Sequence, residues 1–213
     1  MRRMNRRALL ILPVALLSAA SAAAQPGFQP TAQDRADLAR IETYLDSLRA
    51  LKAHFLQVAP NGAVSQGTAW LERPGRMRFQ YDPPSPLLLV AGHGLVVFYD
   101  KSLNQTSNFP IGQTPLGILL ADHVQLLGGA VTVTGMQRLP GQIQVSLVRT
   151  ASPGDGTLTL VFADNPLALR QWTVLDAQRQ ETHVTLYNAE LGGRFDPKLF
   201  EFIDPRFLQP NSG

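Results

Sequence analysis

Two expected β-strands meet within residues 67–81, which read Gly67-Thr68-Ala69-Trp70-Leu71-Glu72-Arg73-Pro74-Gly75-Arg76-Met77-Arg78-Phe79-Gln80-Tyr81. This stretch contains the end of the first strand and most of the second. Its second half lies in a strand expected at Arg76 to Asp82. In that strand Met77, Phe79 and Tyr81 alternate with polar residues. Because successive side chains of a strand point to opposite faces, one face is apolar and the other polar. The apolar face should line a cavity or a filled core beneath it.

The same two-residue period continues on both sides of this stretch, from about Leu51 almost to the C-terminus. The expected strands are Leu51 to Val58, Val64 to Glu72, Arg76 to Asp82, Leu87 to Ala91, Leu95 to Asp100, Asn104 to Phe109, Val131 to Gln137, Gln142 to Arg149, Thr157 to Ala163, Leu169 to Leu175 and Thr182 to Ala189. Turn residues such as Asn61-Gly62 and Pro140-Gly141 separate them. So many short antiparallel strands predict a large curved sheet or a barrel.

An amphipathic helix precedes the strands. Apolar residues recur at helical spacing at Leu38, Ile41, Leu45 and Leu48. Acidic and basic residues stand between them, as on a helix with one buried face. Thr31 is placed to cap this helix, and Asp34 completes a box-like pair near its positive end. We therefore expect the helix to begin near Ala32.

A second helix is expected at Thr114 to Ala121, where it interrupts the strands. Pro115 stands in its first turn, and apolar residues surround it nearly all round. Such a helix must be covered on most sides. The two helices could close the open mouth of a curved sheet. The pattern equally allows an ordinary α+β core in which helices cover one face of a filled sheet.

The N-terminus is typical of an export signal. Basic residues come first, at Arg2, Arg3, Arg6 and Arg7. An apolar run from Ala8 to Leu17 and small residues from Ser18 to Ala24 follow. The apolar run is about half the roughly 20 residues that span a bilayer, so a retained anchor is not expected. Cleavage after Ala24, or a residue or two earlier, would leave one domain at 25–213.

Removal of the signal changes the charge of the chain. Four of the 19 basic residues lie within it and all 16 acidic residues lie beyond it, so the mature chain carries about −1. The remaining Lys and Arg residues form no long cluster, and nucleic acid is therefore not an expected partner. The chain has no cysteine. A disulfide framework, a cysteine-based zinc site and a lipidated N-terminal cysteine are all excluded.

Residues 67–81 and several later motifs resemble the periplasmic lipoprotein carrier protein LolA family over essentially the whole mature chain. The later motifs are Pro86, Leu89-Val90-Ala91, Phe98-Tyr99-Asp100, Asn104-Gln105-Thr106, Thr114-Pro115 and Phe195-Asp196-Pro197-Lys198-Leu199-Phe200-Glu201-Phe202. They stand in the family's order, and the last of them looks like the family's closing strand. The resemblance implies a mainly β, α+β fold. It consists of an unclosed antiparallel β-barrel of about 11 strands with a helical lid over an apolar cavity.

The resemblance also implies a function. The protein would be a periplasmic, monomeric carrier, neither an enzyme nor dependent on a cofactor or metal. It would take lipid-modified lipoproteins from an inner-membrane lipoprotein-releasing ABC transporter and deliver them to an outer-membrane lipoprotein receptor. Each acyl methylene shielded from water is worth roughly 0.8 kcal/mol, so a free lipoprotein would aggregate in water.

The expected site has two parts. Arg73 occupies the family's lid-contacting position, where a guanidinium hydrogen-bonds to the closed lid, although without the family it reads as a solvated arginine. The residues expected to bind acyl chains are Met77, Phe79, Tyr81, Leu88, Val90, Leu116, Ile118 and Leu119. The last five lie in runs that are apolar on both faces, so ordinary core packing is an equal alternative for each.

Three other functions find less support in the sequence. The four histidines are scattered, with neither a metal-binding H-E-x-x-H pattern nor a G-x-S-x-G nucleophile motif in the chain. An outer-membrane lipoprotein receptor of this fold would need the lipidated cysteine that the chain lacks. A periplasmic regulatory module that senses lipoproteins or binds lipid is the main alternative, but such regulators usually carry a second domain.

Overall fold

The computed structural model describes residues 27–205, which form one antiparallel sheet with two α-helices. The expected signal cleavage near Ala24 lies outside the described residues. The strands are β1 (Ala50–Val58), β2 (Val64–Glu72), β3 (Arg76–Tyr81), β4 (Leu87–Gly92), β5 (Leu95–Asp100), β6 (Gln105–Pro110), β7 (Leu127–Gly128), β8 (Val131–Leu139), β9 (Gln142–Arg149), β10 (Gly156–Ala163), β11 (Ala168–Asp176) and β12 (Glu181–Leu191). The helices are α1 (Ala32–Ser47), α2 (Leu116–Leu119) and the 3-10 turns η1 (Ile111–Gln113), η2 (Pro153–Asp155) and η3 (Pro197–Phe200).

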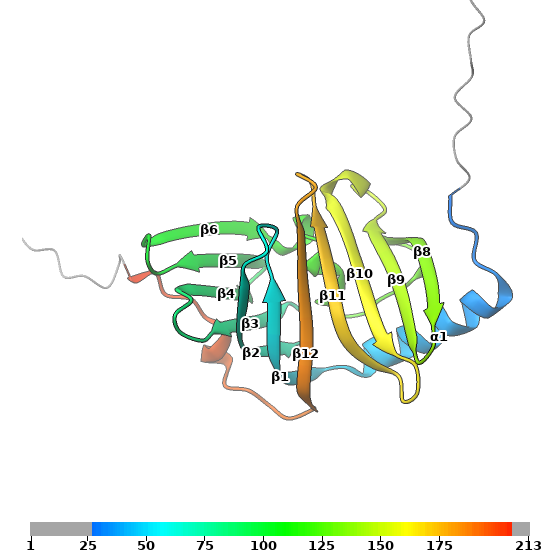
Figure 1. The fold of residues 1–213 in the computed structure, drawn as a ribbon, viewed down its shortest axis with the longest axis horizontal. Helices are drawn as coiled ribbons and strands as arrows, with labels where there is room; N and C mark the ends of the chain where they lie inside the picture. Colours follow the sequence, from blue (N-terminus) through cyan, green and yellow to red (C-terminus); the bar gives the residue numbers. More distant parts are fainter. Residues whose placement is uncertain (1–26, 206–213) are drawn as a thin grey trace, which may run out of the picture.

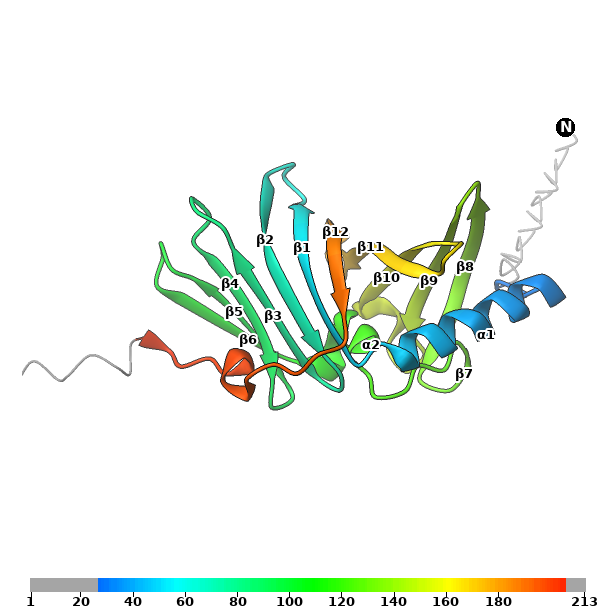
Figure 2. The same ribbon diagram turned by 90° about the horizontal axis from the view of Figure 1, so that it is seen from below.

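The sheet is unclosed. Its strand order is β6-β5-β4-β3-β2-β1-β12-β11-β10-β9-β8-β7, so β6 and β7 are its two free edges. Strands β4 to β6 run nearly across the view of Figure 1 while β10 to β12 run nearly upright, which shows how strongly the sheet twists and curves. Seen from below, α1 and α2 lie along one side of this curved sheet (Figure 2). Within residues 27–205, no helix combines the length and the apolar character needed to cross a membrane.

The expected fold class is confirmed, and all eleven expected strands are present within two residues of their expected ends. The twelfth, β7, has only two residues and pairs with the start of β8. So short a segment carries no recognisable period. The lid helix α2 is shorter than expected, because η1 and an extended Thr114 precede it.

The end of the described chain differs from expectation. The segment Phe195 to Phe202 resembles a closing strand in sequence, but within the described residues it contains the turn η3 and no strand. Pro197 has no N–H to donate to a ladder, and the Asp196 side chain instead accepts from the Lys198 amide at 2.9 Å. The expectation of a strand here was therefore wrong.

This C-terminal segment crosses the outer face of β3 to β6. Arg78 donates to the Leu199 carbonyl at 3.2 Å, and the rings of Tyr99 and Phe202 lie 5.3 Å apart. Farther along, the Thr106 hydroxyl donates to Asp204 at 2.9 Å. The segment thus covers apolar surface on the convex face of the sheet.

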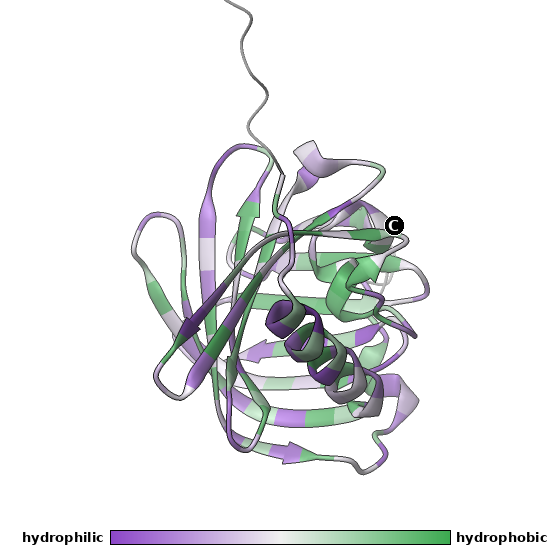
Figure 3. Cartoon of the chain, turned by 90° about the vertical axis from the view of Figure 1, so that its right-hand side faces the viewer, coloured by the Kyte–Doolittle hydropathy of each residue, from purple (hydrophilic) through white to green (hydrophobic). Residues whose placement is uncertain are grey.

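Helix α1 begins as expected. The Thr31 side chain accepts from the Asp34 amide while the Asp34 carboxylate accepts from the Thr31 amide, which completes a capping box. The inward face of α1 buries Leu38, Ile41 and Leu45 completely. Its outward face is mainly hydrophilic (Figure 3). The helix is thus amphipathic, and it covers the β8 to β11 half of the sheet.

Ion pairs fix the first turns of α1 to β8. The Arg138 guanidinium donates to Asp34 at 2.7 Å and to Asp37 at 2.7 Å. Hydrogen bonds from the Thr31 side chain and backbone, together with Arg138, lower the pKa of Asp34 to about 2. The charged form of the Asp34 carboxylate is therefore stabilised when α1 is packed against β8.

This pairing predicts a loss of stability in acid. Because the pKa of Asp34 is lower in the folded state than the ordinary 3.8, its contribution is complete above pH 4 and disappears as pH falls toward 2. Urea unfolding at pH 5, 4, 3 and 2 should show a steeper loss for the wild type than for Asp34→Asn. Arg138→Gln should lie between them. Equal slopes in all three proteins would contradict the assignment.

Candidate functional site

A cavity of about 230 Å³ lies under α2, between the two halves of the sheet. Its walls come from β1, β3, β4, β5, β11, β12 and α2. The lining residues are Gln57, Met77, Phe79, Tyr81, Leu89, Phe98, Leu116, Trp172, Val174, Thr182 and Val184. Most of these side chains are aliphatic or aromatic, so the interior is suited to apolar ligands.

Aromatic rings form one side of the cavity. The ring of Phe79 lies 5.9 Å from Trp172 and 4.6 Å from Phe55, which lies 5.1 Å from Tyr81. The Tyr81 hydroxyl donates to Gln57 at 2.8 Å. Burial raises the pKa of Tyr81 to about 12, although the Gln57 hydrogen bond opposes the shift. Since Tyr81 is the one titratable residue among those lining residues, the wall carries no charge at neutral pH.

Four of the residues predicted to bind acyl chains line this cavity. They are Met77, Phe79 and Tyr81 from β3 and Leu116 from α2. Two others, Ile118 and Leu119, lie in the lid helix itself, where they are buried in the main core and do not line the cavity.

The remaining two, Leu88 and Val90, point to the convex face, so the cavity residue on β4 is Leu89 instead. The register explains the difference. Phe79, which faces the cavity, pairs with Leu89, while Arg78, on the opposite face, pairs with Val90. Residues 87–91 are all apolar because both faces of β4 are covered, one by the core and the other by the C-terminal segment. Alternation could not reveal which residues faced inward.

Arg73 lies at the turn between β2 and β3, with its side chain completely buried. Its Nε donates to the carbonyl oxygen of Ala121 at 2.7 Å, and another guanidinium N–H lies 3.4 Å from the carbonyl oxygen of Asp122. A third N–H donates to the carbonyl oxygen of Leu45 in α1. One planar group thus joins the segment that follows the lid to the end of α1.

The environment of Arg73 consists mainly of carbonyl oxygens. The nearest carboxylate oxygen, of Asp46, is 3.8 Å away. Burial lowers the pKa of Arg73, and the negative charges of Asp46 and Asp122 oppose that shift. An arginine remains protonated under these conditions. The segment after the lid therefore stabilises the buried charge of Arg73. If that segment moved away, the guanidinium would lose these hydrogen-bond partners.

The sequence did not reveal a second contact at the same turn. The amide of Gly75, two residues after Arg73, donates to the carbonyl oxygen of Leu120 at 2.9 Å. The β2–β3 turn therefore contacts three consecutive carbonyls after α2, at Leu120, Ala121 and Asp122. Backbone donors of this kind leave no signature in residue types.

Further bonds hold the segment after the lid. Arg49 pairs with Asp122 at 2.6 Å, and the Val124 amide donates to Asp46 at 3.2 Å. At Gly117, inside the lid helix, an added Cβ would lie 2.5 Å from the Ile111 carbonyl oxygen. The close approach of η1 and α2 therefore requires glycine there.

No Asp, Glu, His, Lys or Arg is among the residues that line the cavity. Among residues 27–205, no group of three or more His, Asp or Glu side chains is placed to hold a metal ion. The lining has aliphatic and aromatic groups with a few neutral polar ones. Such a wall can shield apolar chains from water, and Leu116 of α2 forms part of it.

Comparison with known proteins identifies the family of this chain. Residues 46–203 match the family described as "Outer membrane lipoprotein carrier protein LolA". An outer-membrane lipoprotein carrier protein of Methylococcus capsulatus is 30% identical over 208 residues, covering 93% of this chain and 94% of the relative. One from Alkalilimnicola ehrlichii is 33% identical over 205 residues, covering 92% of each.

A crystal structure of a LolA superfamily protein from Nitrosomonas europaea has a TM-score of 0.43 and 8% identity, covering 78% of this chain and 97% of that one. The assignment rests on the sequence matches, which extend over most of the chain and share one description. This chain belongs to the outer membrane lipoprotein carrier protein LolA family.

Proposed function

We propose that this chain is a periplasmic carrier that binds the acyl chains of lipoproteins released from the inner membrane and delivers them to the outer membrane. The observation that carries the proposal is an uncharged apolar cavity beneath a lid that one buried arginine fastens. The names of the relatives support it, since they are outer-membrane lipoprotein carrier proteins.

The volume of the cavity supports a lid that opens. Pockets that enclose drug-sized ligands measure about 300 to 1,000 Å³. The cavity measures about 230 Å³, so it is too small for several long acyl chains. Cargo must displace α2, whose Leu116 faces the cavity. Acyl chains and the lid then compete for the same apolar surface, and the free energy of lid closure helps to release the cargo.

Arg73 sets the balance between these states. Its hydrogen bonds to the carbonyls after the lid exist in the closed state, so they favour the empty carrier. A carrier that bound its cargo as tightly as the apolar surface allows would release it only very slowly. These hydrogen bonds of Arg73, which we call the latch, reduce the net affinity for cargo and make transfer to an acceptor possible.

The partners follow from this role. The carrier would act as a monomer. It would receive lipoproteins from an inner-membrane lipoprotein-releasing ABC transporter and transfer them to an outer-membrane receptor. Export through the signal at residues 1–24 would bring it to the periplasm. Determination of the N-terminal sequence of the exported protein would test cleavage after Ala24.

The cavity predicts different effects for two neighbouring leucines. Leu89→Glu places a carboxylate against the acyl chains, and burying an unpaired charge is costly, so retention of an acylated lipoprotein should fall at least about tenfold. Leu88→Glu makes the same chemical change one residue away, on the convex face, and should leave retention close to wild type. Co-purification of a lipoprotein with each variant measures the effect.

Both leucines are partly buried, so thermal unfolding of the two variants controls for stability. Equal loss of binding in the two variants, with folding intact, would contradict a cavity on the Leu89 face. Loss in Leu88→Glu alone would indicate that cargo binds to the convex face.

The latch predicts that Arg73→Leu strengthens retention of cargo. Hydrogen bonds from a charged donor contribute roughly 1.5 to 3 kcal/mol, which corresponds to about a ten- to hundredfold shift toward the open state. Uptake of cargo should proceed while transfer to an acceptor fails. Release of an acylated lipoprotein to acceptor membranes, followed over time, measures this.

Arg73→Lys is the matched control, because lysine keeps the charge but cannot bridge several carbonyls with a planar fork. It should retain cargo to an intermediate degree. Transfer at the wild-type rate by a folded Arg73→Leu protein would show that Arg73 does not act as a latch.

A further inference from the structure

A second hollow, which we call the N-terminal groove, lies between the start of α1 and the β7–β8 edge of the sheet. Its volume is about 380 Å³, which is larger than that of the central cavity and within the usual range of ligand pockets. It shares no lining residue with the central cavity. It is therefore a separate site, and the carrier function proposed above does not use it.

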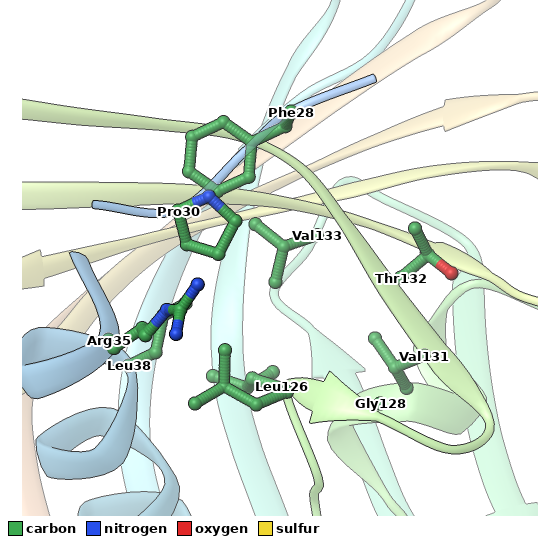
Figure 4. Close-up of a pocket in the computed structure, with 10 residues that line it drawn as sticks. Phe28, Pro30, Arg35, Leu38, Leu126, Gly128, Val131, Thr132 and Val133 are labelled. Atoms are coloured by element: carbon green, nitrogen blue, oxygen red, sulfur yellow. The ribbon is translucent and has the colours of Figure 1, made fainter. Parts of the chain in front are cut away.

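The wall of the groove is largely apolar. In Figure 4 the side chains of Phe28, Pro30, Leu126 and Val133 surround a hollow toward which the Arg35 guanidinium points. Phe28 and Pro30 come from the segment before α1, and Val133 from β8. An apolar wall with one cation at its margin is suited to an amphiphile that has a single negative charge.

Several other polar groups at the groove already have partners. The amide of Leu127 donates to Glu42 at 3.3 Å, and the Leu126 amide donates to the same carboxylate. The Thr132 hydroxyl is bonded to Thr150 at 2.9 Å. Arg35 is the one charged side chain among the residues that line the groove.

Arg35 differs in this respect from the arginines around it. Arg40 pairs with Asp37 and Asp164, and Arg138 pairs with Asp34 and Asp37. Within residues 27–205, the Arg35 guanidinium has neither a hydrogen bond nor an ion pair. The carboxylate next to it in sequence, Asp34, is occupied by Thr31 and Arg138. A planar guanidinium in this position can bind a carboxylate with two parallel hydrogen bonds.

We propose that the N-terminal groove binds a fatty acid, with its carboxylate on Arg35 and its chain along Phe28, Leu126 and Val133. One cation matches one acidic head group, and the apolar wall matches one chain. A concave hollow also favours a single molecule over a membrane surface, since a membrane-binding face presents several basic residues to the lipid head groups.

The test compares binding of laurate with binding of dodecanol, which has the same chain length and no charge. The processed protein should bind laurate at least about tenfold more tightly than dodecanol, and Arg35→Gln should lose this preference. Arg170→Gln removes an exposed arginine of β11 that does not line the groove, and it should keep the preference. In NMR titrations, laurate should shift the amide resonances of residues 126–133.

Two of the variants separate this site from the proposed carrier function. Leu89→Glu, which changes the central cavity, should leave the laurate preference intact, and Arg35→Gln should leave retention of an acylated lipoprotein intact. The proposal is overturned if laurate and dodecanol bind equally, or if Arg35→Gln keeps the preference. It is also overturned if the shifted amides lie only around the central cavity, or if the protein binds anionic vesicles but not laurate.

Discussion

An unclosed sheet leaves a concave apolar face that water would wet unless other parts of the chain cover it. In this protein the cover is held by the β2–β3 turn, where Arg73 and the Gly75 amide contact the three carbonyls that follow α2. Because the same cover lies over the cavity, the bonds that complete the fold would also control access to the site in the proposed carrier. The proposed function thus links fold stability and cargo release through one turn.

Three segments cover the apolar surfaces on the two faces of the sheet. Helix α1 buries Leu38, Ile41 and Leu45 over one half of the sheet, while α2 closes the centre. The C-terminal segment covers the convex face of the other half, through contacts that reach from Arg78 to Thr106. Of these three, α2 is the shortest and the one whose Leu116 faces the cavity, so it is the part best placed to move.

Much of the fold could be predicted from local patterns. The alternation at Met77, Phe79 and Tyr81 identified the inward face of β3, and Thr31 with Asp34 identified the start of α1. The inward face of β4 could not be identified, because burial on both sides makes residues 87–91 uniformly apolar. In each correct case one local rule, such as a period or a cap, was sufficient.

The candidate site depended more on tertiary structure. The contact of Arg73 with the lid was anticipated through resemblance, while its bond to Leu45 and the Gly75 contact depend on backbone positions that no residue type encodes. The resemblance also predicted a closing strand that does not form. There the local effects of Asp196 and Pro197 determine the structure and produce the turn η3 instead. Similarly, the free guanidinium of Arg35 became apparent only when the partners of the neighbouring arginines were known.

The central claim is that cargo binds by displacing a latched lid. The chain contains no cysteine, so spin labels on two introduced cysteines report one distance without background. Lys52 on β1 and Gln113 before α2 are both exposed and suit this pair. Pulsed electron paramagnetic resonance should show one narrow distribution of the label-to-label distance for the empty protein. After an acylated lipoprotein is loaded, a second distribution at longer distance should appear. In Arg73→Leu the longer distance should already be present without cargo. The same distribution in the empty, loaded and Arg73→Leu proteins would contradict the account.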